Sequence, residues 1–524
     1  MNQAILRRVA VHDRYQLEMK LGYPLLRGKS TRYHIDTYIF VPHSLGINVV
    51  TYGRSDFYRD IQHYVRMKTP QFTLREMLEK TSSPLCESER ILAQHPANLS
   101  PELENNLRNA FRFLRAILKG ALQAAALPLN RTAPADAAAR SASFDGVAQQ
   151  MLTNGAELLA RYRALERPLQ RAAAGPALRR TYRLTDESMS LLLEEALLQL
   201  HVKAAQWLQE GERTAWREQI AAEIRSEVAY RRDQGYPSVL TRQAREEYLL
   251  RVSALKKFTS SVLWLPTSVR REGTTWEHVL FSVAAGVSMV FATVIAFYAQ
   301  ALYGQYTLPV FVALVVAYMF KDRIKELGRA VSSTFLSRRL YDYRTVIQTQ
   351  DEQRMLGFVR EKMVYVDLAR VPPDVLAVRN AGGAHDLDLP SQLETVLLYA
   401  KDVTLNESAF PYIVAHDLGG SAINDIMRYD IRPFLRKMDN PHQEKLMLDG
   451  ERVVSVRCHK TYHVNLVSVF HSEDQERPTI ERTQLVLDRK GINAIAQFDE
   501  TGALLDSAAQ ADKLIEATES EDAP

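Results

Sequence analysis

Adjacent histidine and aspartate residues occur twice in this chain, as His385-Asp386 and as His416-Asp417. Imidazole nitrogens and carboxylate oxygens are ligands of Zn²⁺, so each pair is a candidate part of a metal site. Both pairs lie beside glycine-rich segments, where polar side chains commonly form turns, and their spacing supplies no complete ligand set. The sequence therefore favours turn or surface roles for both pairs over a metal-dependent hydrolase.

A further histidine pair, His459 and His463, is separated by four positions. That spacing would place both rings on one face of a helix, and positions 459, 461 and 463 also share a face in a strand. The apolar residues around them predict a strand. Two strand histidines can bind zinc, but no third ligand follows from the spacing. We keep both as candidate metal ligands, with ordinary exposed or core histidines as the alternative.

Other chemistry-bearing motifs are absent from the sequence. It contains no phosphate loop, dinucleotide fingerprint, nucleophile elbow, HExxH motif or kinase signature. Cys86 and Cys458 are the two cysteines, which fits a reducing compartment and excludes a disulfide framework. A net charge of +4 over 524 residues is too small to indicate a nucleic-acid partner. The sequence thus favours a protein without cofactor or enzymatic activity.

The middle of the chain contains a long stretch without charge. The 42 residues from Val279 to Phe320 separate His278 from Lys321. A bilayer hydrocarbon core about 30 Å thick needs about 20 apolar helical residues, so this stretch suits two passes and is too long for one. A buried hairpin in a soluble core is the alternative, and it is disfavoured because soluble helices usually keep a polar stripe.

The break between the two passes follows from helix-end signals. Gly304 can end one helix, and Pro309 can lie in the first turn of the next. We therefore predict transmembrane helices at 279–302 and 308–327, joined as a tight hairpin.

Basic residues flank the hairpin on both sides, while the connecting turn has no charge. The positive-inside rule then places both flanks, and both termini, in the cytoplasm. The first group is Arg251, Lys256, Lys257, Arg270 and Arg271, and the second is Lys321, Arg323, Lys325, Arg329, Arg338 and Arg339.

Small residues recur at helical spacing along the predicted membrane helices. Such a ridge lets helix backbones approach closely in lipid, although alanine is also common by chance. The sequence leaves open whether the ridge contacts its own partner helix or another chain. Its members are Ala284, Ser288, Ala292, Ala296, Ala313 and Ala317.

The segment before the membrane is predicted as three parts. Residues 1–55 have strand-like alternation and form a small β element, and residues 56–240 have helical periodicity and form a helical cytoplasmic domain. Residues 241–272 form a basic amphipathic helix beside the membrane. This helix either lies in the headgroup plane or packs as an ordinary soluble-domain helix, and the sequence does not decide between the two.

The segment after the membrane is predicted as an α+β domain at 328–498. A helix continues from the second span to about Phe358, a second helix covers 424–438, and Asp449-Gly450 marks a β-hairpin. The hairpin begins an antiparallel sheet that runs to residue 498. Residues 499–524 are acidic and are predicted as a disordered tail.

Taken together, the sequence predicts an α+β, mainly α, multi-pass protein of the inner (cytoplasmic) membrane. Its partners are the lipid bilayer and either a protein partner or further copies of itself. The favoured role is a membrane-anchored regulatory or scaffolding platform. The alternatives are a membrane-tethered metal-dependent enzyme using the C-terminal histidines and an oligomeric channel or transport component.

Overall fold

The chain forms two compact units in a computed structural model. Unit 1 combines Met1–Val65, Pro266–Phe410 and Asn424–Pro524, and unit 2 combines Arg66–Leu265 with Pro411–Ile423. The residues described within these limits are 6–25, 29–69, 71–130, 134, 136–304, 307–350, 354–381, 393–407, 422–450, 452–472 and 477–506.

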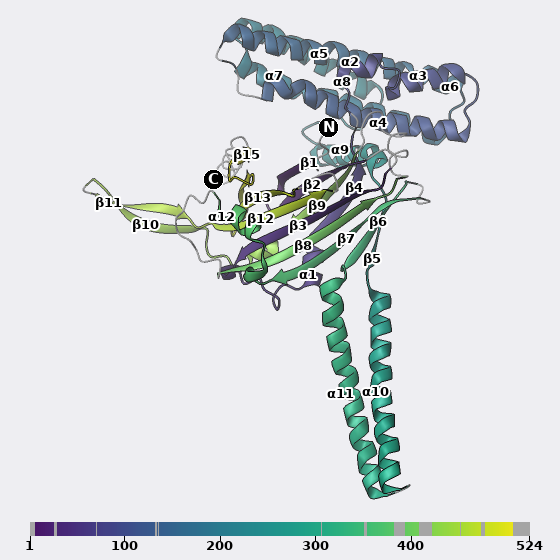
Figure 1. The fold of residues 1–524 in the computed structure, drawn as a ribbon. Coiled ribbons are helices and arrows are strands. Elements are labelled where there is room, and N and C mark those ends of the chain that lie inside the picture. The colour runs from purple at the N-terminus through teal and green to yellow at the C-terminus, as the bar shows by residue number, and fades with distance from the viewer. Residues whose placement is uncertain are drawn as a thin grey trace. The chain divides into compact units, whose positions relative to one another are not determined.

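Unit 1 is built mainly from two β-sheets (Figure 1). The larger sheet has the strand order β15-β14-β13-β12-β3-β8-β7-β6-β5, and its neighbouring strands all pair antiparallel. Its strands are β3 (Thr31–Pro42), β5 (Thr267–Arg271), β6 (Tyr343–Gln348), β7 (Met355–Val366), β8 (Glu394–Leu405), β12 (Tyr462–Ser472), β13 (Thr479–Asp488), β14 (Gly491–Phe498) and β15 (Leu504–Asp506).

The smaller sheet has the order β1-β2-β9-β4. Its strands are β1 (Leu6–Asp13), β2 (Gln16–Pro24), β4 (Ile61–Met67) and β9 (Ala422–Asp430). A separate two-stranded sheet consists of β10 (His442–Asp449) and β11 (Arg452–His459). Short helices α1 (Arg54–Asp60), α12 (Pro373–Asn380) and α14 (Arg432–Leu435), with 3-10 turns η1 (His43–Leu45) and η4 (Leu368–Arg370), complete this part of the unit.

The core of unit 1 lies between the two sheets. Leu17 from β2, Met427 from β9 and Leu397 from β8 are at most 4% exposed and belong to one apolar cluster. The other face of β3 is also covered, because Phe40 packs in a second cluster with Val375 of α12. Burial on both faces explains the nearly continuous apolar run in the second half of β3.

Unit 2 is a bundle of helices. Its elements are α2 (Leu74–Glu79), α3 (Pro84–Gln94), α4 (Pro101–Ala126), η2 (Leu127–Asn130), α5 (Ala137–Ala164), α6 (Glu166–Arg171), α7 (Pro176–Trp207), α8 (Glu210–Asp233), α9 (Arg245–Ser260) and η3 (Ser261–Leu263). Tyr162 of α5 stacks on Tyr182 of α7 with ring centroids 5.0 Å apart, and Phe111 of α4 meets Tyr162 edge-on. These aromatic rings join three helices in one core.

A helical hairpin interrupts the larger sheet between two paired strands. Helices α10 (Thr274–Tyr303) and α11 (Leu308–Arg339) follow β5 and precede β6, and β5 pairs with β6 as the last two strands of the sheet. The chain thus leaves the sheet edge at Arg271 and returns directly opposite it at Tyr343.

Two predicted helices are wrong. The helix expected to continue to Phe358 ends at Arg339, and strands β6 and β7 occupy the rest of that segment. The helix expected at 424–438 is strand β9 followed by the short helix α14. In both cases pairing within a sheet overrides a local pattern that is compatible with a helix.

The structure also places the flanking segments differently from the sequence prediction. The strands expected as a separate element at 1–55 belong to the two sheets of unit 1, and β3 pairs with β8 and β12 from the C-terminal half. Within 241–272, α9 buries Leu255 in unit 2, as a soluble-domain helix does. In the predicted tail 499–524, residues 504–506 form β15, and residues 507–524 lie outside the described part of the chain.

Candidate functional site

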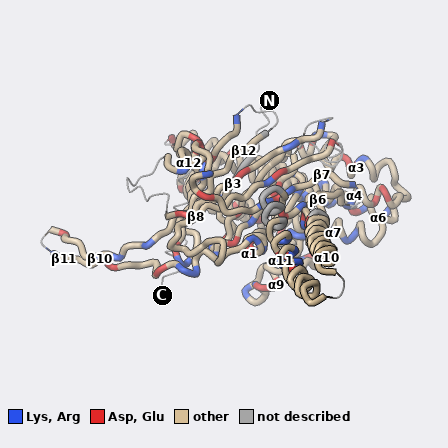
Figure 2. The backbone as a smooth tube through the Cα atoms, turned by 60° about the horizontal axis from the view of Figure 1, so that its bottom comes forward, with Lys and Arg blue, Asp and Glu red and all other residues tan. Residues whose placement is uncertain are grey.

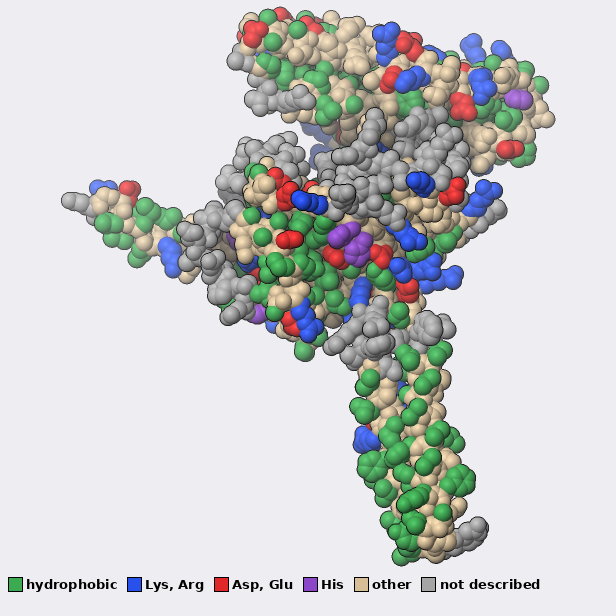
Figure 3. Space-filling model, in the orientation of Figure 1, with side chains coloured by type: hydrophobic (Ala, Val, Ile, Leu, Met, Phe, Trp, Pro, Cys, Tyr) green, Lys and Arg blue, Asp and Glu red, His purple; other side chains and the backbone are tan. Residues whose placement is uncertain are grey.

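The α10–α11 hairpin exposes most of its apolar surface. Helix α10 contains an apolar stretch of 27 residues, Glu277–Tyr303. Its most apolar 18-residue window has a mean hydropathy of 2.3, and only 11% of that window is buried. More than half of the exposed large apolar side chains among the described residues lie on these two helices, and Figure 3 shows them covering the outside of the hairpin. Such a surface is unusual in water and ordinary in lipid.

The two helices are not equally apolar. Within the described residues, α10 is the one helix long and apolar enough to span a membrane. In α11 the apolar run Leu308–Phe320 has only 13 residues before Lys321. The predicted span 308–327 therefore includes several charged residues, and crossing by the second helix stays a prediction. Figure 2 shows the charge-free tip that the two helices share.

The predicted ridge of small residues lies largely between the two helices. Ser288 and Ala292 of α10 are 2% and 7% exposed, and Ala317 of α11 is 1% exposed. A Cβ added to Gly328 would lie 2.7 Å from the Cβ of Ala284, so the backbones are close there. Ala296 and Ala313, the other predicted members, are half-buried.

Unit 1 contains a buried ionic cluster between its two sheets. Lys401 of β8 is 2% exposed, and its ammonium group contacts the carboxylate of Asp425 on β9. Lys401 Nζ also lies 3.5 Å from Glu361 Oε1 on β7. His63 of β4 approaches both carboxylates, with Nε2 3.2 Å from Glu361 Oε1 and Nδ1 3.9 Å from Asp425 Oδ1. Tyr399 donates a hydrogen bond to Glu361.

Electrostatics hold this cluster in its charged form. Burial would lower the pKa of Lys401, but Asp425 and Glu361 outweigh burial and raise the pKa. Burial would likewise raise the pKa of Asp425, but Lys401 and His63 outweigh it and hold the pKa below its ordinary range. Mutual pairing of this kind stabilises ions in a low-dielectric interior. Lys401 and Asp425 therefore form a charged pair at neutral pH.

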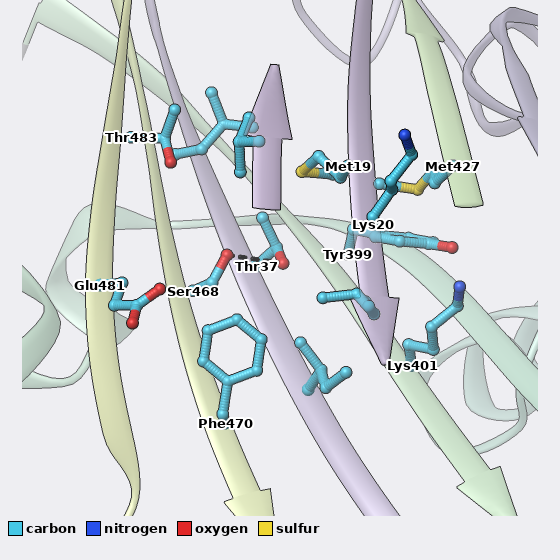
Figure 4. A pocket seen from close by; sticks show the side chains of 14 residues that line it. Met19, Lys20, Thr37, Tyr399, Lys401, Met427, Ser468, Phe470, Glu481 and Thr483 are labelled. Atoms are coloured by element: carbon cyan, nitrogen blue, oxygen red, sulfur yellow. Dashed lines mark hydrogen bonds between the residues drawn. The ribbon is translucent and has the colours of Figure 1, made fainter. Parts of the chain in front are cut away.

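A small cavity lies beside this cluster (Figure 4). Lys401 and Tyr399 line it together with Phe470 and with Thr37, whose hydroxyl lies 3.1 Å from that of Ser468. Its volume of about 40 Å³ is room for about three water molecules. A cavity of this size fits water and is too small for an organic ligand.

A second group of charged and ionisable side chains forms a row across the outer face of the larger sheet. His471, His34, Asp402 and Arg360 stand directly opposite one another on β12, β3, β8 and β7. His34 Nδ1 lies 2.5 Å from Asp402 Oδ1, and its Nε2 lies 3.1 Å from Asp36 Oδ2. The hydrogen bond with Asp36 raises the pKa of His34 to about 9, against the opposing effect of burial. Figure 3 shows histidine, acidic and basic side chains together on this unit.

The predicted metal ligands are not brought together. His459 ends β11, and its ring lies 4.5 Å from that of His442, whereas His463 lies in β12 of the larger sheet. The single strand expected across both positions does not form. Among the described residues, no three His, Cys, Asp or Glu side chains are grouped to hold a metal ion. The pairs His385-Asp386 and His416-Asp417 lie outside the described residues.

The β10–β11 arm is exposed along almost its whole length. Leu446, Leu448 and Val453 near its tip are 75%, 67% and 66% exposed. An isolated two-stranded hairpin is only marginally stable in water. Among the described strands, neither β10 nor β11 pairs with a third one, so their outer edges can accept a further strand. The arm is therefore a candidate protein-binding element, which the sequence had indicated only as a β-hairpin.

The ionic cluster of unit 1 was missed at the level of sequence. Lys401 and Asp425 are 24 positions apart, and Glu361 and His63 come from other strands. The one available signal was a lysine and a tyrosine in the mostly apolar segment Val396–Val403. No family model, curated protein or solved structure matches this chain.

Proposed function

We propose that this chain is a membrane-anchored platform, in which the α10–α11 hairpin holds both units at the cytoplasmic face of the inner membrane. The observation that carries the proposal is the exposed apolar surface of α10, only 11% of whose most apolar stretch is buried. A helix of this length in a soluble protein would keep a polar stripe toward water. Lipid is the environment in which such a surface is stable.

The hairpin crosses the bilayer and does not merely dip into it. The apolar run of α11 spans about 20 Å at about 1.5 Å per residue, against about 30 Å of hydrocarbon. The flexible stem of Lys321 covers part of the difference, and the remaining mismatch costs roughly 1–3 kcal/mol. A turn held inside the hydrocarbon would instead leave several helix-end backbone groups unpaired, at several kcal/mol each. The smaller cost favours crossing.

The orientation follows from charge at the two ends. Arg270 and Arg271 precede α10, and Lys321, Arg323 and Lys325 follow the apolar part of α11. Basic residues of this kind stay on the cytoplasmic side, so the turn at 304–307 faces the opposite side. The sheets of unit 1 and the helices of unit 2 then share one compartment.

A regulatory or scaffolding role is supported by the β10–β11 arm. Its tip exposes Leu446, Leu448 and Val453, and within the described part of the chain its two strands pair only with each other. Exposed apolar side chains and free strand edges are the features through which β-strands bind other proteins. We propose that the arm engages a cytoplasmic protein partner.

The test is a labelling experiment on the full chain in intact cells and in membranes. Thr307→Cys, in a background with Cys86→Ser and Cys458→Ser, is treated with a membrane-impermeant maleimide. We expect the protein to resist carbonate extraction from membranes and position 307 to be labelled from outside. A matched Asn406→Cys variant of unit 1 should be labelled only after the membrane is opened. Carbonate-soluble protein would refute the anchor, and labelling of 406 from outside would refute the orientation.

A further inference from the structure

Helix α4 of unit 2 carries four basic residues on one side. With 3.6 residues per turn, positions 108, 112, 115 and 119 fall within about 60° of one another around the helix axis and cover about 16 Å of its length. Burial lowers the pKa of Lys119, and Lys256 of α9 lowers it further, so a fifth cation lies close to this row. We call the five residues the α4 basic cluster: Arg108, Arg112, Arg115, Lys119 and Lys256.

The cluster lies where α4 packs against α7 and α9. Arg115 donates a hydrogen bond from Nε to Ser188 Oγ of α7 at 3.0 Å. The Arg112 guanidinium lies 4.4 Å from the ring centre of Phe258 on α9. Arg115 is 8% exposed, whereas Lys256 is an exposed residue. The α4 basic cluster therefore extends from the helix interface to the surface of unit 2.

Within the described part of the chain, none of these cations forms an ion pair with a carboxylate. Arg108 donates a hydrogen bond to the side-chain amide oxygen of Asn105. Burial lowers the pKa of Arg112, and Arg108 lowers it further. Glu195 of α7 opposes the lowering of the pKa of Lys119 but does not pair with it. The cluster thus has an excess of positive charge.

Other arginines of unit 2 are paired. Arg163, Arg231 and Arg251 are buried or partly buried, and each forms an ion pair with a carboxylate. Burying a cation without its counterion costs free energy, and like charges one turn apart on a helix repel each other. Unit 2 therefore supplies carboxylates to these arginines and leaves the α4 basic cluster without them. An anion from outside the chain would supply the missing charge.

The side-chain types indicate which anion fits. Guanidinium groups present paired N–H donors that match phosphate oxygens, and lysine adds a mobile point charge. Because the cations are spread over about 16 Å of helix, either one ligand carries several anionic groups or several ligands bind side by side. A nucleic-acid duplex is disfavoured, because binding it needs many accessible cations and Arg115 is buried against α7.

We propose that the α4 basic cluster binds phosphate groups, carried either by a phosphorylated small molecule or by the headgroups of anionic lipids. The proposal does not depend on the membrane anchor, because all five cations belong to unit 2. The anchor bears only on the source of the phosphate. If the hairpin is anchored as proposed, lipid headgroups are available, because only residues 261–273 separate α9 from α10.

Binding to the full chain in mild detergent tests the cluster. The probes are tripolyphosphate, followed by calorimetry, and dioleoylphosphatidylglycerol, followed by native mass spectrometry, with dioleoylphosphatidylcholine as the zwitterionic control lipid. The variant combines Lys119→Gln with Lys256→Gln, because neither side chain forms a hydrogen bond or ion pair with a described residue. We expect its affinity for at least one phosphate probe to fall at least tenfold.

Arg225→Gln with Arg232→Gln is the matched control, because it removes two exposed charges from α8 of the same unit. Its affinities should change less than twofold. A selective loss of tripolyphosphate binding identifies a soluble ligand, and a loss of phosphatidylglycerol binding identifies lipid headgroups. Either result supports the proposal.

Four outcomes would overturn the proposal. The wild type could bind neither phosphate probe, or both double variants could bind the probes equally well. The wild type could also bind a DNA duplex more tightly than either probe. Finally, a thermal midpoint of the lysine variant well below that of the control, measured without probe, would show that the cations stabilise the bundle themselves. Carbonate-soluble wild-type protein would refute the anchor and leave this proposal unaffected.

Discussion

Replacing Lys401 with methionine tests how far the buried ionic cluster stabilises unit 1. Lys401 is 2% exposed and contacts the carboxylates of Asp425 and Glu361. Methionine keeps most of the apolar stem but leaves two buried carboxylates without their cation. Removing one partner of a buried ion pair costs about 3–5 kcal/mol. We expect the free energy of opening the two sheets to fall by about this amount at pH 7.

Hydrogen exchange followed by mass spectrometry measures this loss locally in the full, detergent-solubilised chain. At about 1.4 kcal/mol per tenfold change, amides of β7, β8 and β9 should exchange roughly 150- to 5,000-fold faster than in the wild type. Comparing the two proteins at the same pH removes the intrinsic pH dependence of exchange. The peptides of unit 2 serve as an internal reference, because Lys401 forms its ion pairs with Glu361 and Asp425, which both belong to unit 1.

The pH dependence has a definite sign. In the wild type the pKa of Asp425 is lowered by folding, so its contribution to stability is present at neutral pH and disappears as the pH falls through the folded pKa. In the variant the ammonium group that lowers the pKa of Asp425 is missing, so burial raises this pKa and protonation of Asp425 in acid reduces the loss of stability. The difference between the two proteins should therefore shrink from pH 7 toward pH 4.

Lys20→Met is the matched control for the charge itself. Lys20 lines the same cavity, but its side chain is 44% exposed and pairs with Glu18 at 2.8 Å. Exposed pairs contribute about 0–1 kcal/mol, so exchange should accelerate less than about fivefold. If amides of Lys401→Met exchanged no faster than those of Lys20→Met, the cluster would not stabilise unit 1 as argued. The same would follow if the loss of stability in Lys401→Met, relative to the wild type, grew larger in acid.

Three further substitutions have defined expected outcomes. Gly491→Ala should lower the thermal midpoint of unit 1 by several degrees, because φ is 144° and the added Cβ would lie 2.3 Å from a backbone carbonyl oxygen. His34→Gln should cost about 1 kcal/mol after solvent screening. Folding raises the pKa of His34 to about 9, so the stability difference between wild type and variant is fully present below about pH 6.5. The difference should disappear as the pH rises through about 9, as thermal melts over this pH range will measure. Glu227→Gln should destabilise unit 2 by about 2–3 kcal/mol, because it weakens the bidentate pair with Arg163. The thermal midpoint of unit 2, followed by tryptophan fluorescence, should fall accordingly.

Local signals in the sequence were accurate where short-range chemistry decides the structure. Thr73 and Glu76 have the three-residue spacing of a capping box and form one, with each side chain bound to the other's backbone N–H. Asp449-Gly450 forms the turn between β10 and β11, and Gly450 has the positive φ of 63° that favours glycine there. The mixed helix and antiparallel-sheet composition was also predicted correctly.

Long-range pairing could not be read from the sequence. Strand β3 lies between β8 and β12, partners more than 350 positions away, so the N-terminal strands could not be assigned to the C-terminal sheet. The same pairing creates the ionic cluster, because Lys401 meets Asp425 and Glu361 only across strands. Burying an unpaired lysine costs free energy, so the burial of Lys401 is explained only once its carboxylate neighbours on other strands are known.

The position of the α10–α11 hairpin within the sheet makes it separable from the rest of the fold. Arg271 and Tyr343 face each other as the last pair of β5 and β6, so the whole excursion through α10 and α11 begins and ends at one rung of an antiparallel ladder. A two-residue turn can close such a pair without moving either strand. Excising residues 273–341 and joining the ends with Asn-Gly should therefore keep every strand of unit 1 in register. Because the excised hairpin is the proposed membrane anchor, we expect the shortened chain to be purified without detergent.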